Sequence, residues 1–212
     1  MDGAPTAVQA GHERSASKGA RRRLILDETV RIIGEKGYHG FSIQEVAQAC
    51  GLTNGGLLYY FGSKDQLLVA VLRDRDRGDQ EAIRAEVALV GGLDDVPLDI
   101  IVRAFRAIVA RDAIQPELMR LYAMLRAEAL NPTHPAYDYF ESQEAAALQV
   151  FGQVLSPHVA DGIAAARQIL ALMKGLELQW LREKRGFDLV DAWDRSIASL
   201  LPASAQPVLE RV

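Results

Sequence analysis

The stretch that most constrains the fold runs from Phe41 to Leu68 and reads FSIQEVAQACGLTNGGLLYYFGSKDQLL. Ser42, followed three positions later by Glu45, forms a capping box, which predicts the first residue of a helix. Apolar residues recur at helical spacing as far as Cys50, and Gly51 then suits the left-handed position that ends a helix. The stretch therefore begins with a short helix that stops at a tight turn.

A second short helix is expected directly after this turn. Thr53 can cap it, and it should extend to about Tyr60 before Gly62 breaks it. Ser63 then caps a further helix with Lys64 in its first turn. Two short helices joined by a glycine-containing turn form a helix-turn-helix, whose second member enters the major groove of DNA.

This stretch resembles the tetracycline-repressor (TetR) family of bacterial transcription regulators. The residues that fit the family pattern are Ser42, Ile43, Val46, Ala47, Gly51, Leu52, Thr53, Gly55, Leu57, Tyr60, Phe61, Ser63, Lys64 and Leu67. Two positions depart from it: Gly56 stands where a hydroxyl residue is usual, and Leu58 where a tyrosine is usual. Because Tyr59 and Tyr60 remain, the resemblance implies kept phosphate contacts and altered base or sugar contacts. It covers residues 20–70.

We expect DNA contacts from the basic start of the first helix, from both helix-turn-helix caps and from the recognition helix. The residues are Arg22, Arg23, Ser42, Thr53, Asn54, Gly55, Gly56, Leu58, Tyr59, Tyr60 and Lys64. Asn54 is the side chain of the first recognition turn that can bond bidentately to adenine. The alternative for Lys18 and residues 21–23 is a solvated helix start, but a basic N-terminus opposes the helix dipole and so favours an external anion.

The charge distribution predicts a basic head on an acidic body. The 212 residues carry a net charge of −4, of which residues 1–64 contribute +2 and the remainder −6. An acidic body argues against the alternative of a ligand-independent or structural DNA binder, because architectural binders are usually basic overall. We expect a flexible arm over 1–19, a helix-turn-helix domain over 20–65, a larger ligand-binding and dimerisation domain over 66–202, and a loose tail over 203–212.

An all-α fold is expected, because no stretch alternates as a strand would. The helices are predicted at 20–36, 64–90, 96–113, 116–130, 136–155, 163–185 and 189–201, besides the helix-turn-helix pair. The mixed charges from Arg73 to Arg77 are typical of an exposed helical surface, and Gly91-Gly92 is expected to stop that helix. The predicted core of the head consists of Leu24, Ile32, Phe41, Cys50, Val46, Leu52 and Leu57.

The last two helices are apolar on more than one face, which predicts burial on more than one face. A second copy of the chain would provide the cover, and the resemblance also implies a homodimer that pairs through these helices. The expected interface residues are Leu170, Leu178, Leu181, Trp193, Ile197 and Leu200. A well-covered intramolecular bundle is the alternative. A two-fold dimer predicts a near-palindromic operator in double-stranded DNA.

Aromatic and sulfur-containing side chains collect in the middle helices, where most would simply form core. The resemblance implies an apolar cavity there for an unidentified small-molecule effector that relieves repression. Its candidate residues are Phe105, Met119, Tyr122, Arg126, Met173 and Trp180.

Enzymatic chemistry has no support in the sequence. The four histidines are scattered, the single cysteine cannot form an intrachain disulfide, and there is neither a phosphate loop nor a nucleophile elbow. We therefore expect no catalytic activity, metal or cofactor. No run of about eighteen apolar residues is present, and residues 1–20 lack the apolar segment of a signal peptide. A cytoplasmic location without membrane contact is the resulting prediction.

Overall fold

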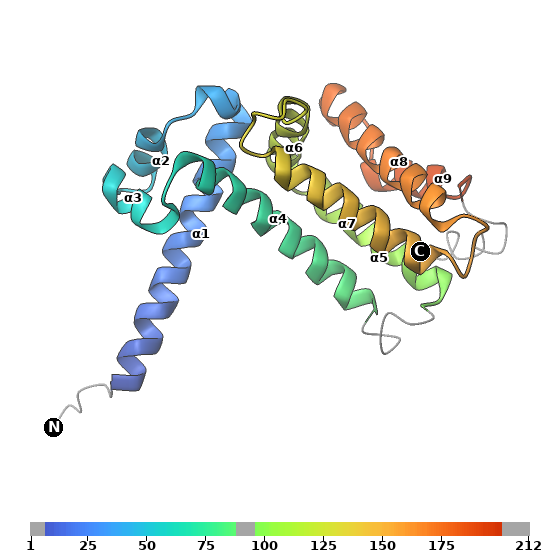
Figure 1. Ribbon diagram of the computed structural model, residues 1–212, viewed down its shortest axis with the longest axis horizontal. Coiled ribbons are helices and arrows are strands. Elements are labelled where there is room, and N and C mark those ends of the chain that lie inside the picture. The colour runs from blue at the N-terminus through green and yellow to red at the C-terminus, as the bar shows by residue number, and fades with distance from the viewer. Residues whose placement is uncertain (1–6, 88–95, 201–212) are drawn as a thin grey trace. The chain divides into compact units, whose positions relative to one another are not determined.

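The computed structural model describes residues 7–87 and 96–200 and contains helices and no strand within those ranges (Figure 1). The helices are α1 (Ala7–Gly40), α2 (Ile43–Ala49), α3 (Asn54–Phe61), α4 (Lys64–Val87), α5 (Leu98–Ala113), α6 (Pro116–Glu128), α7 (Tyr137–Leu155), α8 (Gly162–Arg182) and α9 (Leu189–Ile197). They form two compact units, Met1–Leu72 and Arg73–Val212. The predicted all-α fold is confirmed, and most helix ends lie within three residues of those expected.

The first helix differs from the prediction at both ends. It is helical from Ala7, so residues 7–19 are not the flexible arm that the sequence predicted. Alanine is the strongest helix former and recurs through this segment, which outweighs its glycines. Near its other end, Gly37 has φ 72° and ψ 172°, so the chain kinks there before α2. The predicted tail and the Gly91-Gly92 stop lie outside the described residues.

The core of the first unit is set by one face of α1. Ile25, Ile32 and Ile33 are almost fully buried, which is the spacing of a single helical stripe. Leu24 was predicted inside, but it is 41% exposed because it precedes that stripe by one residue and points about 100° away from it. Phe41 and Leu57 of the predicted core are buried, as are Val46 and Cys50, whereas Leu52 is half-buried.

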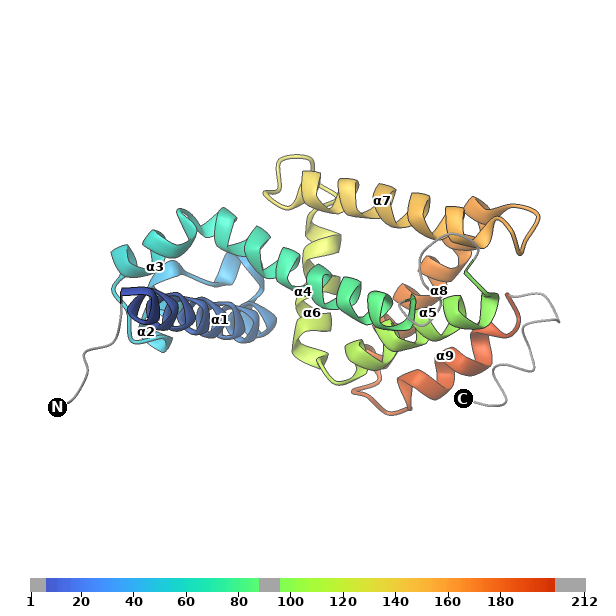
Figure 2. The same ribbon diagram turned by 90° about the horizontal axis from the view of Figure 1, so that it is seen from below.

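In the second unit, α5 packs against α9, and α7 packs against α8 (Figure 2). Trp193 and Ile197 of α9 are completely buried in the core that α9 shares with α5 and α8. The prediction that these two side chains face a partner subunit is therefore wrong, because the chain itself covers them. The α7–α8 contact is close where a Cβ added to Gly162 would overlap the carbonyl oxygen of Gly152.

None of the described helices combines the length and the apolar character needed to cross a bilayer.

Candidate DNA-binding surface and effector cavity

The local structure of the helix-turn-helix follows its caps. The Ser42 hydroxyl accepts from the Glu45 amide at 3.2 Å, and the Glu45 carboxylate accepts from the Ser42 amide at 3.0 Å. Gly51 has φ 63°, the left-handed conformation that costs glycine little. The Thr53 hydroxyl accepts from the Gly56 amide at 3.1 Å and so caps α3. The capping box, the turn glycine and the second cap are confirmed.

The caps orient α3 with one face inward and the start of the helix outward. Leu57 is fully buried, while Thr53, Asn54 and Gly55 are exposed. A Cβ on Gly55 would meet nothing within 4 Å, so the backbone of this turn is open to an external molecule. At Gly56 a Cβ would lie 3.3 Å from the Thr53 hydroxyl oxygen, so a side chain there would press on the cap. The exposed turn can therefore present the side-chain amide of Asn54 and the backbone of Gly55 to a base edge.

Basic side chains gather around α3 within the first unit. Lys18 Nζ lies 5.5 Å from the ring centroid of Tyr59, whose side chain is 77% exposed. The Arg22 guanidinium lies 5.2 Å from the Phe61 ring. Aromatic faces hold these cations at a modest energy while leaving them available to an anion.

The cations expected to contact phosphate differ in their surroundings. Lys64 Nζ lies 4.5 Å from the Phe41 ring and is half-buried, whereas Arg23 is exposed. Arg21, which belongs to the basic helix start considered for anion contact, donates to the carbonyl of Cys50 at 3.3 Å. That bond satisfies a free carbonyl at the end of α2, so Arg21 also fixes the turn. The roles assigned to Ser42, Leu58, Tyr60 and the other expected DNA contacts stay predictions.

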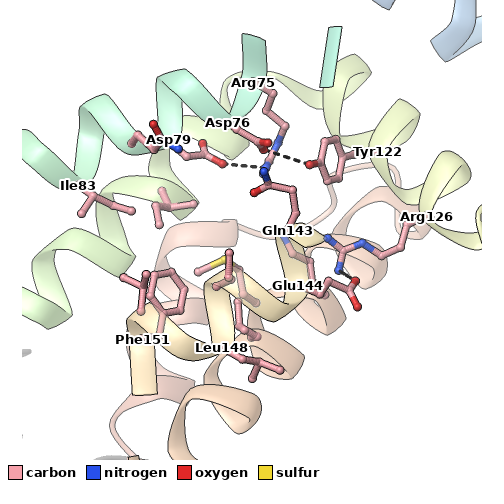
Figure 3. Close-up of a pocket in the computed structure, with 18 of the residues that line it drawn as sticks. Arg75, Asp76, Asp79, Ile83, Tyr122, Arg126, Gln143, Glu144, Leu148 and Phe151 are labelled. Atoms are coloured by element: carbon pink, nitrogen blue, oxygen red, sulfur yellow. Dashed lines mark hydrogen bonds and ion pairs between the residues drawn. The ribbon is translucent and has the colours of Figure 1, made fainter. Parts of the chain in front are cut away.

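A cavity of about 450 Å³ lies among α4, α5, α6, α7 and α8 of the second unit (Figure 3). It is lined by Arg75, Asp76, Asp79, Gln80, Ile83, Ile108, Tyr122, Arg126, Gln143, Glu144, Ala146, Ala147, Leu148, Val150, Phe151, Arg167, Leu170, Ala171, Met173 and Lys174. This volume lies in the range of small-molecule sites, which are about 300–1,000 Å³. The arrangement can enclose a small organic molecule.

The predicted ligand residues divide into two groups. Tyr122, Arg126 and Met173 line the cavity. Phe105, Met119 and Trp180 do not line it and are buried in the core. Phe105 instead supports the wall, because its ring packs edge-to-face on the lining residue Phe151 at 4.8 Å. Leu170, which was expected at the dimer interface, also lines the cavity.

A buried ionic network supports the polar end of the cavity. Arg75 is 5% exposed and donates to Asp79 at 2.7 Å and to both oxygens of Asp112 at 3.0 and 3.1 Å. Arg111 pairs with the other oxygen of Asp79. Burial alone would lower the pKa of Arg75, but Asp112 and Asp79 raise it above its ordinary value. Burial raises the pKa of Asp112 to about 7, against the opposing effect of Arg75.

Arg75 was predicted to lie on an exposed helical surface, but it is buried, so that prediction is wrong. Arg75 follows Leu72 by three residues and Leu68 by seven, so it continues the buried stripe of α4. A charged residue in register with an apolar row was the available signal. The burial of Arg75 was missed because it lies in a run of mixed charges, in which the neighbouring Arg73 and Arg77 are exposed as expected.

Asp76 forms a second polar cluster with two tyrosines. The hydroxyl of Tyr122 donates to Asp76 at 3.1 Å, and the hydroxyl of Tyr139 donates to its other oxygen. The two hydroxyl oxygens lie 2.7 Å apart. Burial raises the pKa of Asp76 and of both tyrosines, so the hydroxyls remain protonated donors.

Comparison with known proteins relates the first unit to a family of regulators. Residues 25–71 match the family described as "Bacterial regulatory proteins, tetR family". The HTH-type transcriptional regulator RutR of Escherichia coli is 36% identical over 67 residues, which span 32% of each chain. The HTH-type transcriptional repressor BepR of Brucella suis is 23% identical over 204 residues, covering 91% of this chain and 95% of BepR. The stronger sequence match thus spans about a third of its relative's length.

Solved structures extend the likeness to the whole fold. The structure of AibR in complex with isovaleryl coenzyme A and operator DNA has a TM-score of 0.63 at 20% identity, covering 86% of this chain and 98% of that one. Residues 25–71 therefore match the TetR family in sequence, and the chain shares its fold with AibR.

Proposed function

We propose that this chain is a DNA-binding transcription regulator, a repressor whose operator binding is relieved by a small molecule. The observation that carries the proposal is the capped helix-turn-helix with an exposed first turn of α3, formed within the segment that matches the TetR family. Asn54 would contact a base edge there, and Lys18, Arg22 and Lys64 would contact phosphates.

The cavity supports an effector that acts through α4. Lining residues from this helix include Asp76, Gln80 and Ile83, so a bound molecule would contact α4 directly. The same helix begins at Lys64, in the first unit. A ligand that binds one orientation of α4 better than another would shift the population that is competent for DNA. Moving that population from mostly bound to mostly free needs about 5 kcal/mol of such preference.

A homodimer would provide the second recognition helix. Leu178 of α8 is 41% exposed, and Leu181 and Leu200 are half-buried, so these three expected interface residues have apolar surface available. Two α3 helices related by a two-fold axis would contact successive major grooves, and their operator would be near-palindromic.

The comparisons favour a sensor over a ligand-independent DNA binder. AibR, which shares this fold, was solved with both isovaleryl coenzyme A and operator DNA, and BepR is named a repressor. A structural DNA binder would have no use for a cavity of about 450 Å³.

Selection from random DNA duplexes tests the proposal. We expect enrichment of a near-palindrome with half-sites about one helical turn apart, bound at least about a thousandfold tighter than random duplex. A variant with Asn54→Ala should lose selectivity at one base pair in each half-site. Recovery of no common sequence, with equal affinity for all duplexes, would contradict the proposed function.

A further inference from the structure

The cavity of the second unit has a polar end and an apolar end (Figure 3). Asp76 and Tyr122 lie toward one end, and Ile83, Leu148 and Phe151 lie toward the other. Such a lining fits a molecule with an apolar body and one polar head. The charge of that head depends on which lining charges already have a partner.

The most deeply buried cation of the lining is already neutralised. Arg75 donates to Asp79 and Asp112, so two carboxylates face one guanidinium. Its Nε has no hydrogen-bond partner among the described residues, but its charge is balanced. Arg75 therefore does not require an anionic ligand.

The other cations of the lining are paired or solvated. Arg126 forms an ion pair with Glu144 at 3.1 Å. Lys174 Nζ lies 3.4 Å from both carboxylate oxygens of Glu177. Arg167 is exposed, so water solvates its charge at little cost.

Asp76 differs from the other lining carboxylates. Its hydrogen-bond partners are the neutral hydroxyls of Tyr122 and Tyr139, and it forms no ion pair in the described part of the chain. The nearby charge of Arg75 lowers the pKa of Asp76, but the guanidinium donates its hydrogen bonds to Asp79 and Asp112. The carboxylate is half-buried, and burial raises its pKa. Two hydroxyl donors orient the group, but they leave its charge in place.

Counting charges around Asp76 gives the same result. The ionic network contains two arginines, Arg75 and Arg111, and two aspartates, Asp79 and Asp112, so its charges balance without Asp76. Asp76 lies outside that network and lines the cavity, so its carboxylate has hydroxyl partners but no ion pair there. An unbalanced charge that is partly removed from water is costly, and an opposite charge brought in by a ligand would relieve that cost.

We propose that the effector of this chain is a hydrophobic cation: its protonated amine pairs with Asp76, and its apolar body lies against Ile83, Leu148 and Phe151. This proposal rests on the regulator function proposed above and specifies the ligand class of that cavity. The cavity aromatics, Tyr122 and Phe151, add a favourable surface for such a molecule.

Three probes that share one apolar chain test the sign of the head. Octylammonium, octanol and octanoate differ in head charge at pH 7 and can be titrated into the intact protein by calorimetry. We expect octylammonium to bind roughly tenfold tighter than octanol, which is the effect on affinity of about one hydrogen bond to a charged group. Octanoate should bind most weakly. This comparison uses the unmodified protein, so it does not depend on any variant folding.

Two variants locate the effect. Asp76→Asn keeps a side-chain oxygen for the hydroxyls of Tyr122 and Tyr139 but removes the charge. The affinity of this variant for octylammonium should therefore fall to its affinity for octanol. Glu141→Gln removes an equal charge from an exposed residue of α7 outside the cavity lining, and the preference for octylammonium should persist. Circular dichroism and thermal unfolding would verify that both variants are folded.

The outcomes separate this proposal from the regulator function. Octanoate binding as tightly as octylammonium, no binding of any probe, or unchanged octylammonium affinity in Asp76→Asn would each overturn the ligand class. Duplex selection with the same protein reports on the regulator function alone. If that selection recovered no common sequence while octylammonium was still preferred, DNA regulation would be rejected and the cation-binding cavity would stand.

Discussion

The two units use arginine and lysine in opposite ways. In the first unit, Lys18 and Arg22 lie over aromatic rings near α3, where an external anion could reach them. In the second unit, Arg75 is buried between Asp79 and Asp112 and belongs to the chain's own structure. The same residue types can therefore serve recognition or stability, and burial decides which. Substitutions at the exposed residues near α3 should therefore change DNA binding, whereas substitution of the buried arginine should change stability.

The largest effect is expected from the buried arginine. Arg75→Ala would leave Asp112 buried without its cation, which should lower the free energy of unfolding by about 3–5 kcal/mol. The control is Arg120→Ala, whose pair with Glu117 at 2.8 Å is half exposed and should be worth less than about 1 kcal/mol. Chemical denaturation measures both. Equal stability of the two variants would contradict the assigned difference.

The recognition turn should affect specificity and leave stability almost unchanged. Asn54 is exposed, so Asn54→Ala should unfold like the unmodified protein. Binding to the selected operator should weaken by about 1–3 kcal/mol at one base pair of each half-site. Repeating the duplex selection with the variant measures this effect. An unchanged consensus would remove Asn54 from base recognition.

Two glycines offer a matched pair for the same comparison. Gly162→Ala would force a methyl group against the carbonyl of Gly152, and overpacking of this kind costs about 1–3 kcal/mol of stability. Gly55→Ala meets nothing within 4 Å and should not destabilise the fold, since alanine favours a helix. Its methyl group should instead weaken operator binding. Loss of stability in Gly55→Ala, or none in Gly162→Ala, would reverse the assignment.

The smallest effect is expected at the proposed phosphate contact. Lys64→Ala should weaken binding to operator and random duplex alike, by about 1 kcal/mol. It should also reduce the slope of log affinity against log salt concentration by about one unit. Titrations at several salt concentrations measure both quantities. Identical salt slopes would contradict a phosphate contact by Lys64.

The helix-turn-helix was predictable because its determinants are local. A capping box between Ser42 and Glu45, a left-handed Gly51 and a cap at Thr53 each act within a few residues, so the sequence alone contains them. Helical periodicity likewise located the helices of the second unit. Leu24 was misplaced because a register error of one residue turns a helix by about 100°.

The cavity could not be derived in the same way. Its lining residues come from five helices, and Asp76 contacts Tyr139, which is 63 positions away in the sequence. Phe105 and Trp180 were chosen for their type, and long-range packing placed them in the core instead. Likewise, the apolar rows of α9 did not show that α5 covers Trp193.

Linkage between the two ligands tests the central claim, that one protein couples operator binding to the cavity. Octylammonium would be titrated by calorimetry with and without saturating amounts of the selected operator. We predict that operator weakens octylammonium binding, and that octylammonium weakens operator binding by the same factor, because coupling between two binding equilibria is reciprocal. Equal octylammonium affinity in both titrations would contradict the account, since the cavity and the DNA-binding surface would then be independent.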